Sequence, residues 1–381
     1  MFSPARVVTD AERRARLAVR HGLAAGFAGI DAATTAMTAW HATELPSIHL
    51  AIAARVADVT VADVEHDLNE TRALVKQLGL RRTLFAVGRD LLPAVIAGPG
   101  QRVAGPERRR LLKEVAAAGL SRDPEHWLAN AEEGVLDALR DATLTTAEIK
   151  RQVPDVAGAV PVAIGTKWGQ EVPLAPRVLT ILAADGRVAR AANATHWRTS
   201  RPAWTTMTRW LGAEPDLPDA RTAYRDLVAR WLRTFGPGSE DDIVWWLGAT
   251  KTAVRAALAD LGAVPVALAG GVLGWLLPDD LDPVEEPGEW AALVPALAPR
   301  RWAGAVAALT SIRPAGRICS TASEMPPRQS GSTATSPAPG CRTRRTASRS
   351  GGASRSAGGC VGALPRQSRG SRPSWRASGS P

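Results

Sequence analysis

Two polar residues, His41 and Thr43, are separated by a single alanine in a short connector between two predicted helices. The first helix ends near Trp40, and the second begins at about Pro46, because proline is tolerated in the first turn of a helix. In an extended connector, side chains two positions apart point to the same side. An imidazole and a hydroxyl facing one space can position a water molecule or a sugar. The alternative is structural: Thr43 caps the following helix, and His41 is a half-exposed histidine.

Two further segments have the composition of DNA contacts. Arg81 and Arg82 are predicted to lie at the turn between two strands, where they can meet phosphates or simply be solvated. The second segment interleaves cations with aromatic residues, namely His196, Trp197, Arg198, Arg201 and Trp204. Such a segment suits contact with the DNA backbone and the minor groove, and the alternative is a hairpin that packs on its own domain. The histidines His49 and His66 are expected to be structural or solvated. The other tryptophans have core-like spacings and are expected to pack, among them Trp231, Trp245, Trp246 and Trp275.

The elements that would position these residues repeat along the chain. Apolar periodicity predicts helices over residues 10–25, 31–39 and 47–56, and a fourth helix begins after Thr60, an N-cap with Asp63 in the first turn. Strands are predicted over 73–80 and 83–87. Helices followed by a hairpin are typical of a winged helix, although a generic small α+β unit gives the same pattern.

A second copy of the pattern follows a connector. The connector is predicted as helical segments 91–96 and 106–118, separated by a Gly-Pro-Gly turn at 98–100. The second copy has helices over 124–140 and 173–184, a capping box formed by Thr145 and Glu148, and strands over 187–192 and 201–207.

The third copy is the clearest. It has a helix over 221–235, helices capped by Ser239 and Thr250, and strands over 264–269 and 272–277 joined by a two-residue turn at Gly270 and Gly271. The predicted fold class is therefore mainly α with small β-hairpin wings (α+β), in tandem winged helix-turn-helix domains. The predicted domains are winged helices at 10–90, 123–210 and 218–282, a helical connector at 91–122, a linker at 283–299 and a tail at 300–381.

The charge of the chain is unevenly distributed. The formal net charge is +10, but residues 300–381 hold 14 arginines and a single acid, Glu324. Residues 1–299 hold 33 basic and 36 acidic groups, a net charge of −3. Any DNA-binding surface on this part must therefore be a local patch. No apolar run has the roughly 18 residues that a membrane span needs, and the N-terminus lacks the apolar core of a signal peptide, so we expect a cytoplasmic protein.

The last 80 or so residues differ from the rest. Periodicity is lost after about Pro299, and Ser, Arg, Gly, Pro and Ala dominate, which indicates either disorder or a frameshift in the gene. Residues 317–334, back-translated with suitable codons and read one frame over, give an ordinary strand-and-turn sequence. Cys319, Cys341 and Cys360 all lie here and match no zinc-binding spacing, so we expect neither a metal site nor a disulfide framework.

Together these features resemble the AlkZ/YcaQ-like DNA glycosylases, a family of bacterial tandem winged-helix proteins. The resemblance covers residues 10–299 and rests on four motifs: Trp40-His41-Ala42-Thr43, Arg81-Arg82-Thr83-Leu84-Phe85, residues 197–210 and Trp275-Leu276-Leu277-Pro278. It implies excision of alkylated or crosslinked bases from double-stranded DNA. The family's catalytic pair, two glutamines or a glutamine and an aspartate, falls at His41 and Thr43. The family's C-terminal β-rich module, expected after Leu297, is missing from the sequence.

The resemblance implies a glycosylase reaction that needs no metal or redox cofactor. Cleavage of an N-glycosidic bond develops positive charge on the sugar. Neutral His41, with a pKa near the unperturbed value of histidine, would accept a proton from the attacking water while Thr43 orients that water. The alternative is a non-catalytic winged-helix DNA-binding or regulatory protein, because Thr43 has neither an amide nor a carboxylate. The sequence does not fix the lesion or the oligomeric state.

Overall fold

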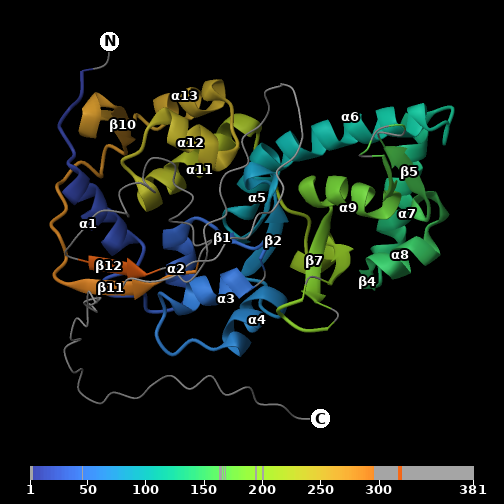
Figure 1. Ribbon diagram of the computed structural model, residues 1–381, viewed down its shortest axis with the longest axis horizontal. Coiled ribbons are helices and arrows are strands. Elements are labelled where there is room, and N and C mark those ends of the chain that lie inside the picture. Colours follow the sequence, from blue (N-terminus) through green and yellow to red (C-terminus); the bar gives the residue numbers. More distant parts are fainter. Residues whose placement is uncertain are drawn as a thin grey trace, which may run out of the picture. The chain divides into compact units, whose positions relative to one another are not determined.

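The structure is a computed structural model that describes residues 3–44, 46–162, 165, 167, 169–193, 195–199 and 201–295, and the backbone of 316–319. Figure 1 shows mainly helices with several small sheets, which is an α+β fold. The first region contains helices α1 (Asp10–Arg20), α2 (Ile30–Met37), α3 (Pro46–Ala53) and α4 (Val61–Asn69) and strands β1 (Trp40–His41), β2 (Leu74–Leu78) and β3 (Leu84–Gly88). Thr60 caps α4 as predicted, and the Asp63 side chain completes a capping box with it.

A three-stranded antiparallel sheet in the order β1-β3-β2 organises the first region. β2 and β3 pair from Leu74 opposite Gly88 to Leu78 opposite Leu84, which confirms the predicted hairpin. The turn between them is the short 3-10 segment η1 (Leu80–Arg82). β1 adds only two residues to the sheet, yet these are the tryptophan and histidine of the connector.

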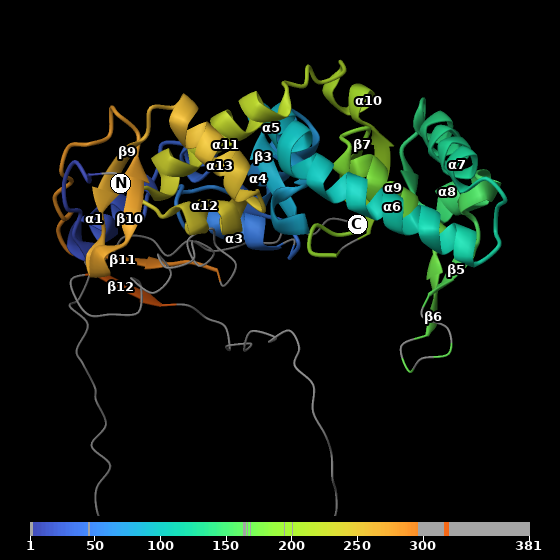
Figure 2. The same cartoon turned by 90° about the horizontal axis from the view of Figure 1, so that it is seen from above.

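The connector helix is continuous, which corrects the predicted break at residues 98–100. α5 (Leu92–Val95) runs through the π-helical turn η2 (Ile96–Gly100) directly into α6 (Gln101–Ala117). Pro99 lies within the π turn, and the wider turn accommodates its missing N–H. Gly100 packs tightly, because a Cβ there would lie 2.5 Å from the Ala184 carbonyl oxygen. Figure 2 shows α6 as a long helix that extends from the first region to the second.

The second region contains helices α7 (Pro124–Leu139), α8 (Thr146–Gln152), α9 (Leu174–Ala184) and α10 (Met207–Leu211), the 3-10 turn η3 (Pro154–Val156) and strands β4 (Leu144–Thr145), β5 (Ala159–Val162), β6 (Gln170–Pro173), β7 (Val188–Asn193) and β8 (Pro202–Thr206). The capping box of Thr145 and Glu148 at α8 is confirmed. The β5–β6 hairpin was not predicted, because its strands are short and each contains a proline, which removes a ladder donor.

The third region contains helices α11 (Ala220–Phe235), α12 (Glu240–Leu247) and α13 (Lys251–Asp260) and the hairpin of β9 (Val264–Ala267) and β10 (Leu273–Leu276). Ser239 and Thr250 cap α12 and α13 as predicted. The hairpin connection spans five residues rather than two, because Leu273 pairs with Ala267 and η4 (Ala269–Gly271) lies between the strands. Gly270 and Gly271 have φ of 72° and 76°, so both glycines still supply the left-handed backbone of the turn.

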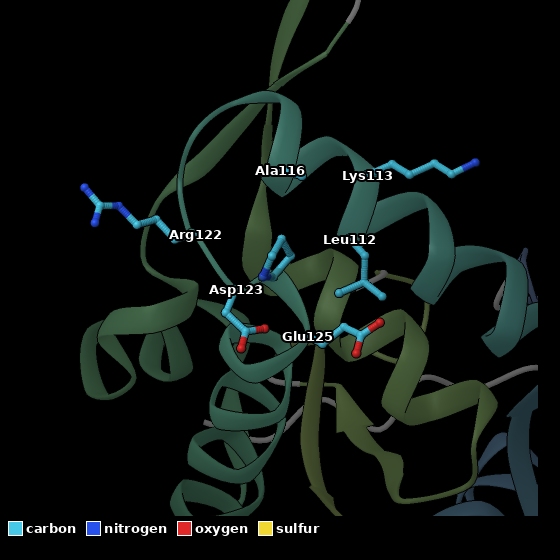
Figure 3. Close-up of a pocket in the computed structure, with 7 residues that line it drawn as sticks. Leu112, Lys113, Ala116, Arg122, Asp123 and Glu125 are labelled. Carbon is cyan, nitrogen blue, oxygen red and sulfur yellow. The ribbon is translucent and has the colours of Figure 1, made fainter.

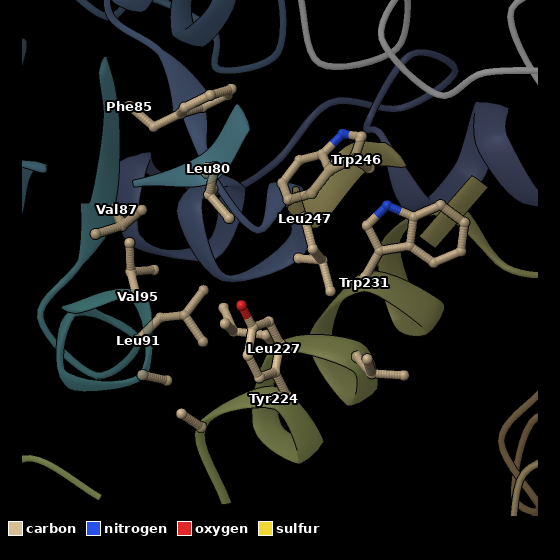
Figure 4. Packing of buried hydrophobic residues seen from close by; sticks show 14 of the residues in the cluster. Leu80, Phe85, Val87, Leu91, Val95, Tyr224, Leu227, Trp231, Trp246 and Leu247 are labelled. Atoms are coloured by element: carbon tan, nitrogen blue, oxygen red, sulfur yellow. The ribbon is translucent and has the colours of Figure 1, made fainter. Parts of the chain in front are cut away.

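The first and third regions share one hydrophobic core, to which β7 and α10 of the second region also contribute, whereas most of the second region packs in another core. In Figure 4, Leu80 and Phe85 from the β2–β3 segment pack with Trp231, Trp246 and other residues of α11 and α12. The separate core of the second region joins α6 through α9 with β7 and β8. The predicted domain boundaries stay a prediction, but the packing ties the site-bearing sheet to the third region.

A charged cluster also fastens α1 to the segment after β10. Arg16 is fully buried, and its guanidinium lies 2.9 Å from Glu12 and 2.8 Å from Asp280. Arg20 donates to the same Asp280 carboxylate. Because a buried charge is stable only when it is paired, this cluster fixes the two ends of the described chain against each other.

β11 (Trp290–Leu293) pairs in parallel with the backbone of β12 (Gly316–Cys319). The interpretation of residues 300–381 as disordered or frameshifted otherwise falls outside the described residues, as do the three cysteine side chains. No helix in the described part of the chain has both the length and the apolar character needed to cross a membrane.

Candidate active site

His41 is placed by the short strand β1. It lies opposite Phe85 in the ladder with β3, and the two rings meet edge to face with centroids 5.3 Å apart. The neighbouring Ala42 N–H donates to the Leu84 carbonyl at 2.9 Å, which extends the pairing by one residue. Trp40 is fully buried and donates from its indole to the Thr34 hydroxyl at 3.0 Å. Backbone pairing and packing therefore hold His41 in one place.

The two candidate catalytic residues differ in exposure. His41 is 4% exposed, whereas Thr43, two positions further along the chain, is exposed. His41 is thus more enclosed than the half-exposed histidine of the structural alternative. The assignment of His41 and Thr43 as a catalytic pair remains a prediction.

The electrostatic environment of His41 keeps it neutral. Burial, and second the positive charge of Arg81, lower its pKa to about 4. The expectation of an imidazole near its unperturbed pKa is therefore wrong, because desolvation disfavours the imidazolium. A neutral imidazole at neutral pH accepts a hydrogen bond readily but is a weak base.

Arg81 lies in the β2–β3 turn, close to α12. Its guanidinium carbon is 3.9 Å from the ring centroid of Trp245, which α12 supplies. Burial lowers the pKa of Arg81 to about 10, so it is still charged at neutral pH. Arg81 therefore acts on His41 through its positive charge and at the same time contacts an aromatic side chain of the third region.

Arg82 points to a different partner. Its side chain is 62% exposed and pairs with Glu107 of α6. The adjacent arginines thus have unequal environments, one half-buried on an indole and the other on the surface. Both are placed at the turn where the sequence predicted them.

The β7–β8 hairpin carries Trp197 and Arg198 in its connection. Trp197 packs on His49 of α3, with ring centroids 4.5 Å apart, and His49 in turn lies 2.8 Å from Glu65 of α4. Arg198 is exposed and its guanidinium lies 5.7 Å from the Trp197 ring. The hairpin connection therefore packs against the first region rather than on its own domain.

Arg201 and Trp204 have opposite surroundings. Arg201 is exposed at the start of the hairpin's second half. Trp204 is 5% exposed, belongs to the second core, and donates from its indole to the Thr146 hydroxyl at 3.1 Å. Trp204 therefore packs in the core of its own region, and we leave it out of the proposed DNA surface.

Trp245 is exposed, which the sequence did not predict. It was expected to pack in the core with Trp246, but it is 43% exposed, whereas Trp246 is 1% exposed. A helix turns by about 100° per residue, so adjacent tryptophans face different directions. The acidic first turn of α12 shows where the helix begins, but it does not show which tryptophan faces the core.

A shallow hollow of about 440 Å³ lies between the end of α6 and the start of α7. In Figure 3, Lys113 and Arg122 extend away from each other at its rim, while Asp123 and Glu125 lie near its centre. Asp123 is occupied as the N-cap of α7. The hollow includes none of the predicted site residues. Within the described residues, no group of three or more His, Cys, Asp or Glu side chains is placed to hold a metal ion.

The fold is similar to that of a known protein. The structure is similar to the solved Streptomyces sahachiroi DNA glycosylase AlkZ, with a TM-score of 0.56 and 17% sequence identity over 72% of this chain and 71% of that chain. The fold is thus that of a DNA glycosylase structure. No curated protein sequence matches the chain significantly.

The family model described as DNA glycosylase AlkZ-like matches residues 34–307, more than two thirds of the chain. This protein belongs to the AlkZ-like DNA glycosylase family, which confirms the predicted resemblance. Membership supports an assignment to DNA repair, with DNA as the substrate.

Proposed function

We propose that this protein is a tandem winged-helix DNA glycosylase that hydrolyses the N-glycosidic bond of alkylated bases in double-stranded DNA. His41 and Thr43 are the proposed catalytic residues. The observation that carries the proposal is a neutral imidazole, fixed by strand pairing, two residues from an exposed hydroxyl and close to the cationic β2–β3 turn. Family membership supports glycosidic-bond cleavage as the reaction.

The tandem winged-helix arrangement is supported by the order of the elements. In the third region, α11, α12 and α13 are followed directly by the β9–β10 hairpin. In the second region, α7, α8 and α9 precede the β7–β8 hairpin, and in the first region helices precede the β2–β3 hairpin. A hairpin after three helices is the arrangement of a winged helix-turn-helix.

The proposed mechanism places little demand on proton transfer. An N-alkylated purine already carries positive charge and leaves readily, so the sugar develops oxocarbenium character before water attacks. Neutral His41 accepts a hydrogen bond from that water, and the Thr43 hydroxyl orients it. The base departs with the bonding electron pair, water then adds to the anomeric carbon, and the surplus proton passes to solvent. Such positioning requires a hydrogen-bond acceptor rather than a strong base.

DNA contact is proposed at two local surfaces. Arg81 and Arg82 form the first, while Trp197, Arg198 and Arg201 form the second. Charged guanidiniums at turns and hairpin connections can reach phosphates without base specificity.

The test is release of methylated purine from double-stranded DNA that has been treated with a methylating agent, measured by mass spectrometry. We expect His41→Ala to lower the release rate at least 100-fold, because the proposed acceptor is removed. The matched control is His66→Ala, since His66 lies exposed on α4 and pairs only with Glu70 in the described contacts. Thermal unfolding of each variant checks that it folds.

If the native protein binds DNA but releases no base, the non-catalytic regulatory alternative is correct. If it releases base equally well with alanine at position 41, the catalytic assignment is wrong. His41→Gln sharpens the test, because an amide also accepts a hydrogen bond, and we expect it to keep activity within about 10-fold of the native protein.

A further inference from the structure

Trp245 differs from the other exposed apolar side chains. Among the described residues with large, strongly exposed apolar side chains, it is the only aromatic one. It lies on α12, whose other tryptophan, Trp246, is buried against Phe85 with ring centroids 6.0 Å apart. Because Phe85 also contacts the ring of His41, α12 is packed directly behind the candidate catalytic strand.

Arg81 is held on Trp245 by an unfavourable backbone conformation. Arg81 and Arg82 have φ of 53° and 59°, in the left-handed region that costs about 1 kcal/mol or more for residues other than glycine. The turn is closed by hydrogen bonds from the Arg82 and Thr83 N–H groups to the carbonyls of Gly79 and Leu80. Gly248, at the end of α12, approaches so closely that a Cβ would lie 3.2 Å from the Arg81 nitrogen. The surrounding structure thus maintains a strained turn that places a guanidinium over an indole.

Further cations flank this pair. Arg82 is 62% exposed, and Arg102 of α6 donates to the Gly248 carbonyl at 2.9 Å while its side chain remains exposed. Exposed cations around an aromatic surface are the usual composition of sites for unstacked nucleic-acid bases, in which phosphates are neutralised and a base stacks. The Arg81 guanidinium covers one face of the indole and presents its own planar outer face, on which a base can also stack.

From this geometry we infer that Trp245 and Arg81 form a stacking platform for a nucleobase displaced from the DNA duplex, next to His41. The inference rests on the proposed function for the identity of the nucleic acid, and it adds that α12 of the third region completes the site. An enzyme that acts on a glycosidic bond must reach a sugar inside the duplex, and holding a displaced base lowers the free energy of that distorted state. Trp245 and Arg81 are positioning residues here, because they hold the base rather than take part in bond cleavage.

The test uses the full-length protein and two duplexes that both contain 2-aminopurine. In the first duplex the 2-aminopurine lies opposite a tetrahydrofuran abasic analogue, and in the second it is paired with thymine. The 2-aminopurine fluorescence reports whether the base leaves the helix stack, and fluorescence anisotropy of an end label reports affinity. We expect the native protein to change the 2-aminopurine signal and to prefer the first duplex over the fully paired one. Trp245→Ala is expected to reduce that preference about 10-fold or more, the size expected for loss of one base–aromatic stack.

Trp245→Phe is expected to keep most of the preference, because a phenyl ring still stacks. Arg81→Lys is expected to reduce it less than Trp245→Ala, because the charge stays while the planar guanidinium is lost. Leu120→Ala is the matched control, since Leu120 is 48% exposed outside the proposed site. Affinity for the fully paired duplex is expected to change less than threefold in the Trp245 and Leu120 variants.

The inference is overturned if Trp245→Ala leaves both the signal and the preference unchanged, or if the native protein binds neither duplex. Its failure is distinct from failure of the proposed function. A native protein that releases no methylated purine but shows a Trp245-dependent preference supports the platform and contradicts the glycosylase activity. A protein that releases the base equally well with and without Trp245, and shows no preference, has the activity without the platform.

Discussion

The β2–β3 turn and the β7–β8 hairpin both place an arginine beside a tryptophan, but they obtain the tryptophan from different places. Arg81 stacks on Trp245, which is more than 160 residues away in the sequence, with 3.9 Å between the guanidinium carbon and the ring centroid. Arg198 lies 5.7 Å from Trp197, its direct neighbour. The first pair requires the folded third region, whereas the second is formed within one connection.

This difference separates two kinds of DNA contact. The pair at the β2–β3 turn is half-buried and acts electrostatically on His41, so changes there should affect the reaction itself. The arginines of the hairpin are exposed, so changes there should affect mainly affinity. The following predictions test that separation, beginning with the largest effect.

Arg81→Ala is expected to slow base release about 30-fold, because the charged contact that Arg81 is proposed to make with the DNA contributes about 2 kcal/mol. The measurement is the single-turnover release rate at saturating DNA. Arg225→Ala is the control, since Arg225 is exposed on α11 and pairs with Asp226. Equal rates for the two variants would mean that the turn is not part of the site.

The double variant Arg198→Ala/Arg201→Ala is expected to weaken DNA binding about 10-fold at low salt. Two lost phosphate contacts also reduce the slope of log affinity against log salt by about 2. The single-turnover rate at saturating DNA should fall much less than with Arg81→Ala. A large loss of rate with an unchanged salt slope would reverse the roles of the two segments.

The buried imidazole of His41 should make the stability of the protein depend on pH. The folded-state pKa of His41 is about 4, below the ordinary 6.5, so between these values the unfolded chain binds a proton that the folded chain does not. Acidification from pH 7 to pH 5 therefore lowers the free energy of unfolding by about 2 kcal/mol through this group.

Urea unfolding at both pH values measures this effect. His41→Gln should lose about 2 kcal/mol less stability than the native protein over that interval. Parallel losses in the two proteins would show that His41 is not desolvated.

The smallest expected effect is a change in the pKa of His41 on removing its charged neighbour. Arg81→Met should raise that pKa but leave it below its ordinary value, because burial is the larger cause and Arg81 the smaller. Histidine side-chain NMR titration resolves the change. An unchanged pKa would mean that Arg81 does not act on His41.

Local features of this fold could be predicted because they depend on residues three or four positions apart. The caps at Thr60 and Ser239 and the capping box at Thr145 follow from such spacings and are confirmed. The hairpins of the first and third regions follow from strand periodicity in the same way. Their connection lengths could not be predicted as reliably, as the five-residue connection at Gly270 shows.

The long-range features could not be read from local spacing. The neutrality of His41 depends on burial against Phe85, and the exposure of Trp245 depends on which side of α12 meets the shared core. The continuous connector helix depends on a π turn that packs against the Ala184 carbonyl. Each of these three features depends on a contact between distant parts of the chain, which hydrophobic periodicity does not predict.

The measurement that tests the central claim most directly is the pH dependence of single-turnover base release by the native protein and by His41→Ala. If neutral His41 positions the attacking water, the native rate is constant from about pH 6 to pH 8 and falls only as the pH approaches 4, while the variant is at least 100-fold slower between pH 6 and pH 8. A native rate that rises through pH 6.5, or a variant as fast as the native protein, would contradict this account.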